Sequence, residues 1–265
     1  MLLGIFGAPR KWVAVYAFNP LVLIDLCANM HYDVFVIAAL LAAMIALSKK
    51  SVIAAFALLG IAALMKYFAL LLLPLFVGAV FRNGPAKDWK KSALGIVVFI
   101  AVIVCGYALF LDKGIDFVKG ILFFANELHV TAYSPYYFIA RAVGKSAANA
   151  TAAILLCGLS AYAFFKMKNS SLHTLMFLML AAVALFSPVQ RPWYFAWALP
   201  LCCFKLSWSW LLLTCASLLT YGIYVSGTDI CPLKMIIYSL FYISVIVEVA
   251  LFIRNRINTT RANNV

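Results

Sequence analysis

Long apolar runs separated by short polar or basic turns dominate the sequence. None of the runs alternates strictly between apolar and polar positions, which favours helices over the strands of a membrane β-barrel. In the hydrocarbon core of a bilayer, a helix satisfies its own backbone hydrogen bonds. The pattern therefore predicts an all-α, polytopic transmembrane bundle that forms a single domain over residues 1–265. The runs are 12–29, 33–48, 51–81, 92–111, 147–166, 172–187, 192–206, 209–225 and 233–253.

The run 51–81 is too long for an ordinary span. A single helix of this length would extend about 45 Å, against a hydrocarbon core of about 30 Å. A hairpin of two short helices with Lys66 near its apex places 14 Lys and Arg on one side of the membrane and seven on the other, whereas one helix gives ten on each. The positive-inside rule favours the hairpin. The expected topology has about ten membrane segments, some short or broken, with both termini cytoplasmic.

Composition agrees with this topology. The chain is 67% hydrophobic and 11% charged, with a mean hydropathy of +1.05, whereas soluble domains are about 25% charged. The net charge of +13 comes from bases grouped between apolar runs, which is typical of cytoplasmic loops and not of a nucleic-acid-binding surface. The seven cysteines show no metal-ligand spacing, so no metal site is predicted. The absence of nucleotide-binding motifs argues against nucleotide hydrolysis.

One long connection, 112–146, is expected on the outer side. Residues 114–127 mix charged and apolar side chains, and this pattern predicts a short amphipathic helix that lies in the membrane interface. Glu127 and His129 follow in the stretch "NELHVTAYSPYYF". They are compatible with a loop that binds a donor or an acceptor, and equally with an ordinary interfacial loop.

The stretch "NPLVLIDLCANMHYD" carries the densest group of polar residues near the N-terminus. Pro20 removes a backbone donor, so the first run should bend or start a helix there. Asp25, Asn29 and Asp33 have i, i+4, i+8 spacing and would line one face of a continuous helix. His31 would then point elsewhere, unless the helix ends near Asn29. A carboxylate at membrane depth needs a partner, a proton or water, so the stretch predicts a polar cavity.

Two further interpretations stay open within this stretch and at the hairpin. Asp33 is also a candidate N-cap for the helix over 34–48. Lys66, in "IAALMKYFALLLLPLF", either extends to the outer interface or acts at depth. At depth it would bind a phosphate or pair with Asp25 or Asp33. Pro74, eight residues further on, predicts a kink or a broken helix.

The stretch "FSPVQRPWYFAWALP" is the second dense polar site. Pro188 should end one helix and Pro192 should open the next at its first turn. Trp193 and Tyr194 suit an aromatic belt at the interface, and also a sugar ring or a prenyl chain. Arg191 lies between the prolines, where a guanidinium can bind a lipid-linked phosphate through two parallel hydrogen bonds.

Together these segments resemble the GT-C membrane glycosyltransferases, in particular the polyprenyl-phosphate-mannose-dependent mannosyltransferases of bacteria. The resemblance lies in the NP and N-x-H-x-D elements of "NPLVLIDLCANMHYD", the lysine and proline of "GIAALMKYFALLLLPLF", and the WY-x-x-W element of "SPVQRPWYFAWALP". It covers roughly residues 15–205. It implies an integral protein of a prokaryotic plasma membrane, with the site facing outward.

The resemblance also implies an activity. A sugar, mannose by analogy, would pass from a polyprenyl-phosphate donor to a lipid or glycan acceptor in one inverting, in-line displacement. A carboxylate would deprotonate the acceptor, and cations would stabilise the leaving phosphate. The implied roles are Asp33 and Asp25 as catalytic residues, Lys66 and Arg191 as phosphate ligands, and Asn29 and His31 as ligands of sugar hydroxyls. A divalent cation is an optional cofactor in this family.

Three alternatives accompany this interpretation. Relatives of this type begin with a further span and an outer loop bearing the catalytic Asp, so the resemblance implies that this part is missing here. It leaves open whether the chain is a fragment, a split subunit whose partner chain supplies this part, or a degenerate relative. A bundle with broken helices and buried charge also suits a transporter or flippase of a lipid-linked or anionic solute, although the sequence has no internal repeat. A non-catalytic membrane subunit is the third alternative.

Overall fold

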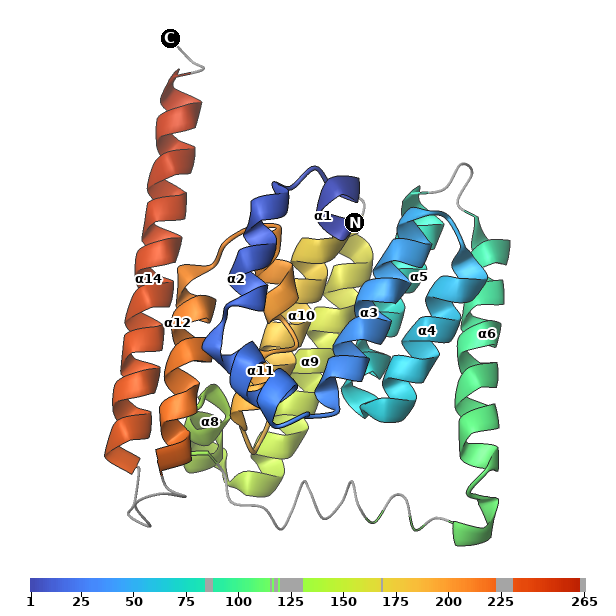
Figure 1. Ribbon diagram of the computed structural model, residues 1–265, viewed down its shortest axis with the longest axis horizontal. Coiled ribbons are helices and arrows are strands. Elements are labelled where there is room, and N and C mark those ends of the chain that lie inside the picture. Colours follow the sequence, from blue (N-terminus) through green and yellow to red (C-terminus); the bar gives the residue numbers. More distant parts are fainter. Residues whose placement is uncertain are drawn as a thin grey trace.

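The structure is a computed structural model that describes residues 1–83, 88–114, 116, 119, 131–167, 169–222 and 231–262. The described residues form helices and connecting turns, with no strand among them, so the all-α prediction is confirmed (Figure 1). The first half contains α1 Leu2–Ile5, η1 Arg10–Trp12, α2 Val13–Ala17, η2 Val22–Ala28, α3 Asp33–Ser48, α4 Val52–Met65, η3 Tyr67–Leu72, α5 Leu73–Asn83, α6 Trp89–Ala108 and η4 Leu111–Lys113. The second half contains α8 Pro135–Val143, α9 Lys145–Lys166, α10 Leu172–Phe186, α11 Pro192–Phe195, η5 Leu199–Cys203, α12 Trp208–Ser217, η6 Leu218–Tyr221 and α14 Cys231–Ala262.

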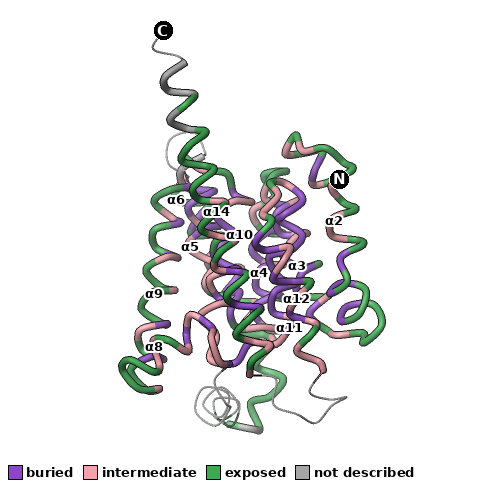
Figure 2. Tube along the Cα trace, turned by 90° about the vertical axis from the view of Figure 1, so that its left-hand side faces the viewer, coloured by how far each residue is buried: buried purple, intermediate pink, exposed green. Residues whose placement is uncertain are grey.

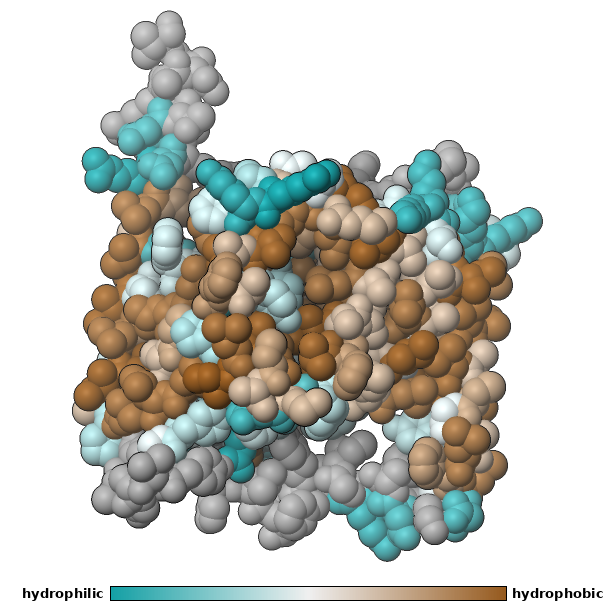
Figure 3. All heavy atoms as spheres, in the orientation of Figure 1, coloured by the Kyte–Doolittle hydropathy of each residue, from teal (hydrophilic) through white to brown (hydrophobic). Residues whose placement is uncertain are grey.

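Three of these helices are long and apolar enough to cross a membrane: α6, α9 and residues 231–255 of α14. The two halves of the broken segment Arg10–Ala17 and Val22–Ala28 would add a fourth if they form one span. The other apolar helices have only 10–17 residues, so the prediction of about ten membrane segments is not confirmed. On the face shown in Figure 3, apolar side chains nevertheless predominate between an upper and a lower border of hydrophilic residues, as expected for a membrane protein.

The predicted break in the run 51–81 is present. α4 ends at Met65, and Lys66 adopts an extended backbone with φ −147° and ψ 113°. The chain then turns through η3 into α5, where Pro74 occupies the first turn and so leaves no hydrogen bond unmade. In Figure 1 the two arms of this hairpin end before the lower end of α6. The apex at Lys66 therefore lies within the bundle and not at its outermost surface.

The predicted bend near Pro20 is also present. The helical segments on either side of residues 18–21 cross at 74°. Asn19 stabilises the bend with its side chain: its Oδ1 accepts from the N–H of Leu21 at 2.9 Å, and its Nδ2 donates to Thr214 Oγ1 at 3.0 Å. The second segment, η2, has π-helical hydrogen bonding, a geometry that is rare and is frequent at functional sites.

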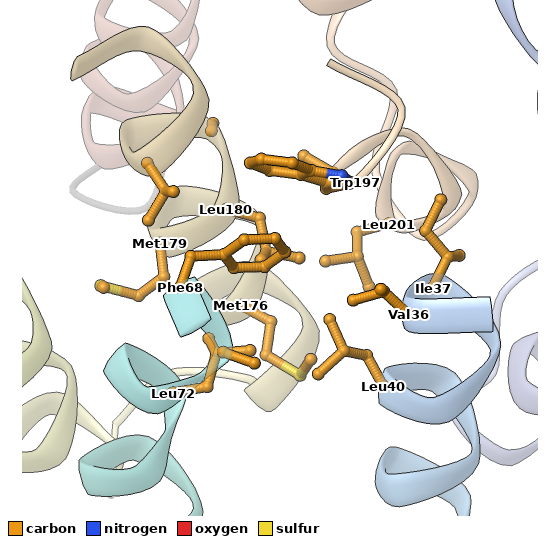
Figure 4. Packing of buried hydrophobic residues seen from close by; sticks show 14 of the residues in the cluster. Val36, Ile37, Leu40, Phe68, Leu72, Met176, Met179, Leu180, Trp197 and Leu201 are labelled. Carbon is orange, nitrogen blue, oxygen red and sulfur yellow. The ribbon is translucent and has the colours of Figure 1, made fainter. Parts of the chain in front are cut away.

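Burial is greatest in the short helices at the centre of the bundle. Figure 2 shows buried residues concentrated in α3, α4 and α10, whereas α9 and α14 are largely exposed. The rings of Trp197 and Phe68 stack within this core, with their centroids 4.0 Å apart. Figure 4 shows them against residues of α3, η3, α10 and η5, namely Val36, Ile37, Leu40, Leu72, Met176, Met179, Leu180 and Leu201.

The long helix α14 is attached to α12 by a carboxylate. Glu248 accepts hydrogen bonds from the backbone N–H groups of Trp208 and Ser209 at 2.8 and 3.3 Å, and from the hydroxyls of Ser207 and Ser209. The first N–H groups of a helix have no partner within it, and the helix dipole favours negative charge there. This explains why a glutamate interrupts the apolar stretch "VIVEVAL".

Glycines allow α4 and α6 to pack closely. A Cβ at Gly95 would lie 2.8 Å from the ring of Phe56, and one at Gly60 would lie 3.0 Å from the Cβ of Val102. Phe56 is fully buried and stacks edge-on against Phe76, so its ring cannot move aside without disturbing the core. Close approach of the two helices therefore depends on the missing side chains.

We expect Gly95→Ala to lower the free energy of unfolding by about 1–3 kcal/mol, because the added methyl overpacks the contact with Phe56. Gly158 is the matched control, since it lies within α9 and a Cβ there would meet nothing within 4 Å. Gly158→Ala should leave stability unchanged or raise it by up to about 1 kcal/mol. Thermal unfolding in detergent measures both variants, and equal effects would contradict the packing argument.

Candidate functional site

A buried carboxylate, Asp33, lies at the centre of the candidate site. It is the first residue of α3 and is 0% exposed. Lys66 Nζ lies 3.1 Å from its Oδ1, and Trp197 donates from Nε1 to its Oδ2 at 3.0 Å. His31 Nδ1 is 3.6 Å from the same Oδ2. Three segments that are distant in sequence, at residues 31–33, 66 and 197, are thus brought together by one anionic group.

The ammonium of Lys66 is surrounded by aromatic rings. Its Nζ lies 4.8, 5.3 and 5.6 Å from the ring centroids of Tyr32, Tyr194 and Trp197. Ring faces attract a cation, more strongly where water is excluded, and the lysine side chain is only 14% exposed. Lys66 therefore does not extend to the outer interface, as one interpretation of the sequence had it. Instead, it pairs with Asp33.

Aromatic residues continue from this pair towards Arg191. His31 stacks between Tyr32 and Trp193, with centroid distances of 5.0 and 4.4 Å. Arg191 is the N-cap of α11, whose first residue is Pro192, as predicted. Its carbonyl accepts from the N–H of Tyr194 at 3.0 Å. Tyr194 is therefore a neighbour of Arg191 through the backbone and of the Lys66 ammonium through its ring.

A second carboxylate, Asp25, lies in η2. Its Oδ1 accepts from Tyr221 Oη at 2.8 Å and from Asn29 Nδ2 at 3.1 Å. Its Oδ2 is buried, and no described residue donates a hydrogen bond to it. The backbone N–H of His31 donates to the carbonyl of Asp25 at 3.0 Å, and its imidazole lies beside Asp33. His31 thus joins the two acidic segments.

The structure decides two questions that the sequence left open in this stretch. η2 ends at Ala28 with Asn29 as its C-cap, and the chain reverses at Met30, whose φ is +50°, so Asp25, Asn29 and Asp33 do not line one face of a continuous helix. Asp25 and Asn29 do contact each other, but Asp33 begins a different helix. Asp33 is also not the N-cap of that helix, since Tyr32 holds this position and makes no side-chain cap.

Some predicted site residues cannot be placed. Glu127 and His129 lie outside the described residues, as does most of the amphipathic helix predicted over 114–127. Within the described part of that segment, Lys119 pairs with Asp116 at 2.6 Å on the surface. Asn29, Lys66, Arg191, Trp193 and Tyr194 are described, and their roles in binding stay predictions.

The sequence did not identify three partners of the acidic groups. Tyr32 precedes Asp33 directly, and its position in "HYD" was the only available signal. The sequence indicated Trp197 only as the last residue of the WY-x-x-W element, whereas its indole N–H donates to Asp33 and its ring packs on the core. Tyr221 is separated from Asp25 by 196 residues, and no sequence pattern connects them.

The described acidic groups do not suit a resident metal ion. No group of three or more His, Cys, Asp or Glu among the described residues is placed to hold one. Divalent cations prefer several carboxylate or carbonyl oxygens, whereas Asp33 already shares its charge with Lys66. We therefore derive no step through a metal.

Comparison with known proteins gives one similarity. Residues 3–82 match the family model of the MptA_B family described as "Alpha-(1->6)-mannopyranosyltransferase, N-terminal domain". The matched region contains Asp25, Asp33 and Lys66. No curated protein and no solved structure matches the chain. The match supports a mannosyltransferase family, and with it a glycosyltransferase that uses a sugar donor and an acceptor.

We expect Asp33→Asn to lower the free energy of unfolding by about 3–5 kcal/mol, because it leaves the buried ammonium of Lys66 without a counter-charge. The double variant Asp33→Asn/Lys66→Met should recover most of this loss. Asp116→Asn is the control, since its ion pair with Lys119 is exposed, and it should have no measurable effect. Thermal unfolding in detergent tests all three; equal stability of the single and double Asp33 variants would show that the buried pair is not coupled.

Proposed function

We propose that the protein is an integral membrane mannosyltransferase that moves mannose from a polyprenyl-phosphate donor to an acceptor hydroxyl. The transfer takes place at the extracytoplasmic end of the bundle. The observation that carries this proposal is the convergence of Asp33, Lys66, His31 and the aromatic rings, within and beside the region that matches the mannosyltransferase domain. The chemistry is an inverting displacement at the anomeric carbon, as in GT-C enzymes.

The donor phosphate would bind between Lys66 and Arg191. Lys66 has three N–H donors, and its ammonium lies 3.1 Å from Asp33 Oδ1. Arg191 offers a planar guanidinium that can bind two phosphate oxygens at once. As the glycosidic bond breaks, negative charge develops on the phosphate, and fixed cations in a site that excludes water stabilise that charge most effectively. Trp193 and Tyr194 would pack against the mannose ring or the first prenyl unit.

Asp33 is suited to positioning and not to proton transfer. Lys66 forms an ion pair with the Oδ1 of Asp33 at 3.1 Å, and Trp197 and His31 lie beside its Oδ2. Its charge holds the ammonium of Lys66 at a fixed place and prevents the lysine side chain from reaching the interface. Preorganised charge of this kind lowers the barrier without further reorganisation during the reaction.

Asp25 is the candidate general base. Its Oδ2 has a free acceptor position, and Tyr221 and Asn29 orient the carboxylate through Oδ1. The residue is 1% exposed, so an acceptor hydroxyl reaches Oδ2 only when the surrounding side chains move aside. Catalytic hydrogen bonds of this kind often form only once substrate is bound. The neighbouring His31 and Asn29 would hold sugar hydroxyls.

The distribution of basic residues supports the proposed orientation. Both chain termini lie at the end of the bundle opposite Lys66 (Figure 1). Basic residues concentrate at that end, which the positive-inside rule assigns to the cytoplasm of a prokaryotic cell. Those described are Arg10, Lys11, Lys49, Lys50, Lys90, Lys91, Lys166, Lys205 and Arg254. The site would accordingly face outward, and a partner chain would supply any further part that the reaction needs.

Purified protein in liposomes should convert polyprenyl-phosphate [¹⁴C]mannose and a mannoside acceptor into a longer mannoside and free polyprenyl phosphate. Chromatography of the labelled products measures this. A transporter or flippase would instead move the label across the bilayer with the sugar–phosphate bond intact. That result, or the absence of product with the partner chain present, would contradict the proposed reaction.

Asp25→Asn should lower kcat at least about 100-fold while the KM for the donor changes little, because a general base contributes about 10²–10⁴. Lys66→Gln should lower kcat and raise the KM for the donor together, since it removes a phosphate ligand. Asp116→Asn is the matched control, an exposed carboxylate outside the cluster, and should keep full activity. Wild-type turnover in Asp25→Asn would remove Asp25 from the mechanism.

A further inference from the structure

A cavity of about 600 Å³ lies at the end of the bundle opposite Lys66. The C-terminal ends of α3, α5 and α9 and the N-terminal ends of α4, α6 and α10 meet around it. α3 runs from Asp33 to Ser48 over 16 residues, so the cavity lies about 24 Å from Asp33 along the helix. It shares no residue with the site described above, and the proposed function makes no use of it.

The floor of this cavity is apolar. The apolar side chains come from four different helices and are Leu47, Val52, Ala79, Val80 and Leu172. Such a surface is too apolar for a freely soluble ion, which would lose its hydration there without compensation. It suits a hydrocarbon chain, whose burial against these side chains is favourable.

The rim of the cavity is polar and positively charged. Lys50 and Lys91 line it together with Asp88. Lys91 pairs with Asp88 at 2.6 Å, whereas Lys50 has no ion pair among the described residues. Lys50 has a φ of +61°, and its N–H donates to the carbonyl of Leu47 at 2.9 Å. The tight turn thus holds the backbone of Lys50, which lines the cavity, at its rim.

Two helix N-termini add to this positive potential. α4 and α10 both begin at the rim, after Ser51 and Ser171, and neither serine caps the first N–H groups with its side chain. Open N–H groups at the start of a helix and the helix dipole both favour an anion. Together with Lys50, they offer a phosphate several donors beside an apolar floor.

We propose that this cavity binds an anionic phospholipid of the membrane. The phosphate lies against Lys50 and the start of α4, and one acyl chain lies along Leu47, Val80 and Leu172. An apolar ligand would leave the charged rim unused, and a soluble phosphate would leave the floor unused. The lipid would contact the ends of α3, α4 and α5. At their opposite ends, α3 begins at Asp33 and α4 ends directly before Lys66.

The test uses purified full-length protein in a neutral detergent, titrated with phosphatidylglycerol and followed by thermal unfolding and native mass spectrometry. Phosphatidylglycerol should raise the melting temperature in a saturable way. Phosphatidylcholine with the same acyl chains should raise it far less, and glycerol phosphate, which has no chain, should not raise it. A response to glycerol phosphate alone, or equal responses to both lipids, would overturn the proposal.

Variants locate the bound lipid. Lys50→Gln should weaken the apparent affinity for phosphatidylglycerol about five-fold, and Ala79→Phe should weaken it by filling the floor. Lys49→Gln is the matched control, an adjacent exposed lysine that does not line the cavity, and should change the affinity less than two-fold. Equal losses in Lys49→Gln and Lys50→Gln would assign the effect to general surface charge and would overturn the site. Since mannosyl transfer is not measured, the outcome is independent of the proposed activity.

Discussion

The charge pair between Asp33 and Lys66 is the interaction on which the arrangement of the site depends. A carboxylate without solvent contact is unfavourable unless other groups compensate its charge, and here an ammonium and an indole N–H do so. Because these partners come from α3, the apex of the α4–α5 hairpin and the segment after α11, one interaction fixes three parts of the bundle relative to each other. The start of α3, the residue after α4 and the segment after α11 are in this way held at fixed positions relative to each other.

This interaction also joins the site to the hydrophobic core. The indole of Trp197 donates to Asp33 on one edge and stacks on Phe68 with its face, so the aromatic layer in Figure 4 forms the boundary between apolar packing and the polar cluster. A ring that carries one polar group is suited to such a boundary. Movement of the cluster would therefore disturb the packing of α10 and α3, which gives the site a rigid base.

The bundle has different chemistry at its two ends. At one end, the Lys66 ammonium pairs with Asp33 and lies over the ring of Tyr194, which stacks on Trp197. At the other, a cavity with an apolar floor and a basic rim lies between helix ends. α3 and the hairpin extend from one end to the other, and glycines allow α4 to pack closely against α6.

The sequence by itself determined the helical class, the bends at Asn19–Pro20 and Lys66, and the helix start at Pro192, because each follows from apolar periodicity or from local backbone chemistry. It also indicated the residue types of the site. Only the tertiary structure decided which of them meet. The spacing of Asp25, Asn29 and Asp33 suggested one face, but Met30 reverses the chain. Tyr221 and Trp197 reach the acids across 196 and 164 residues, and contacts at such separation depend on how whole helices pack, which local patterns do not encode.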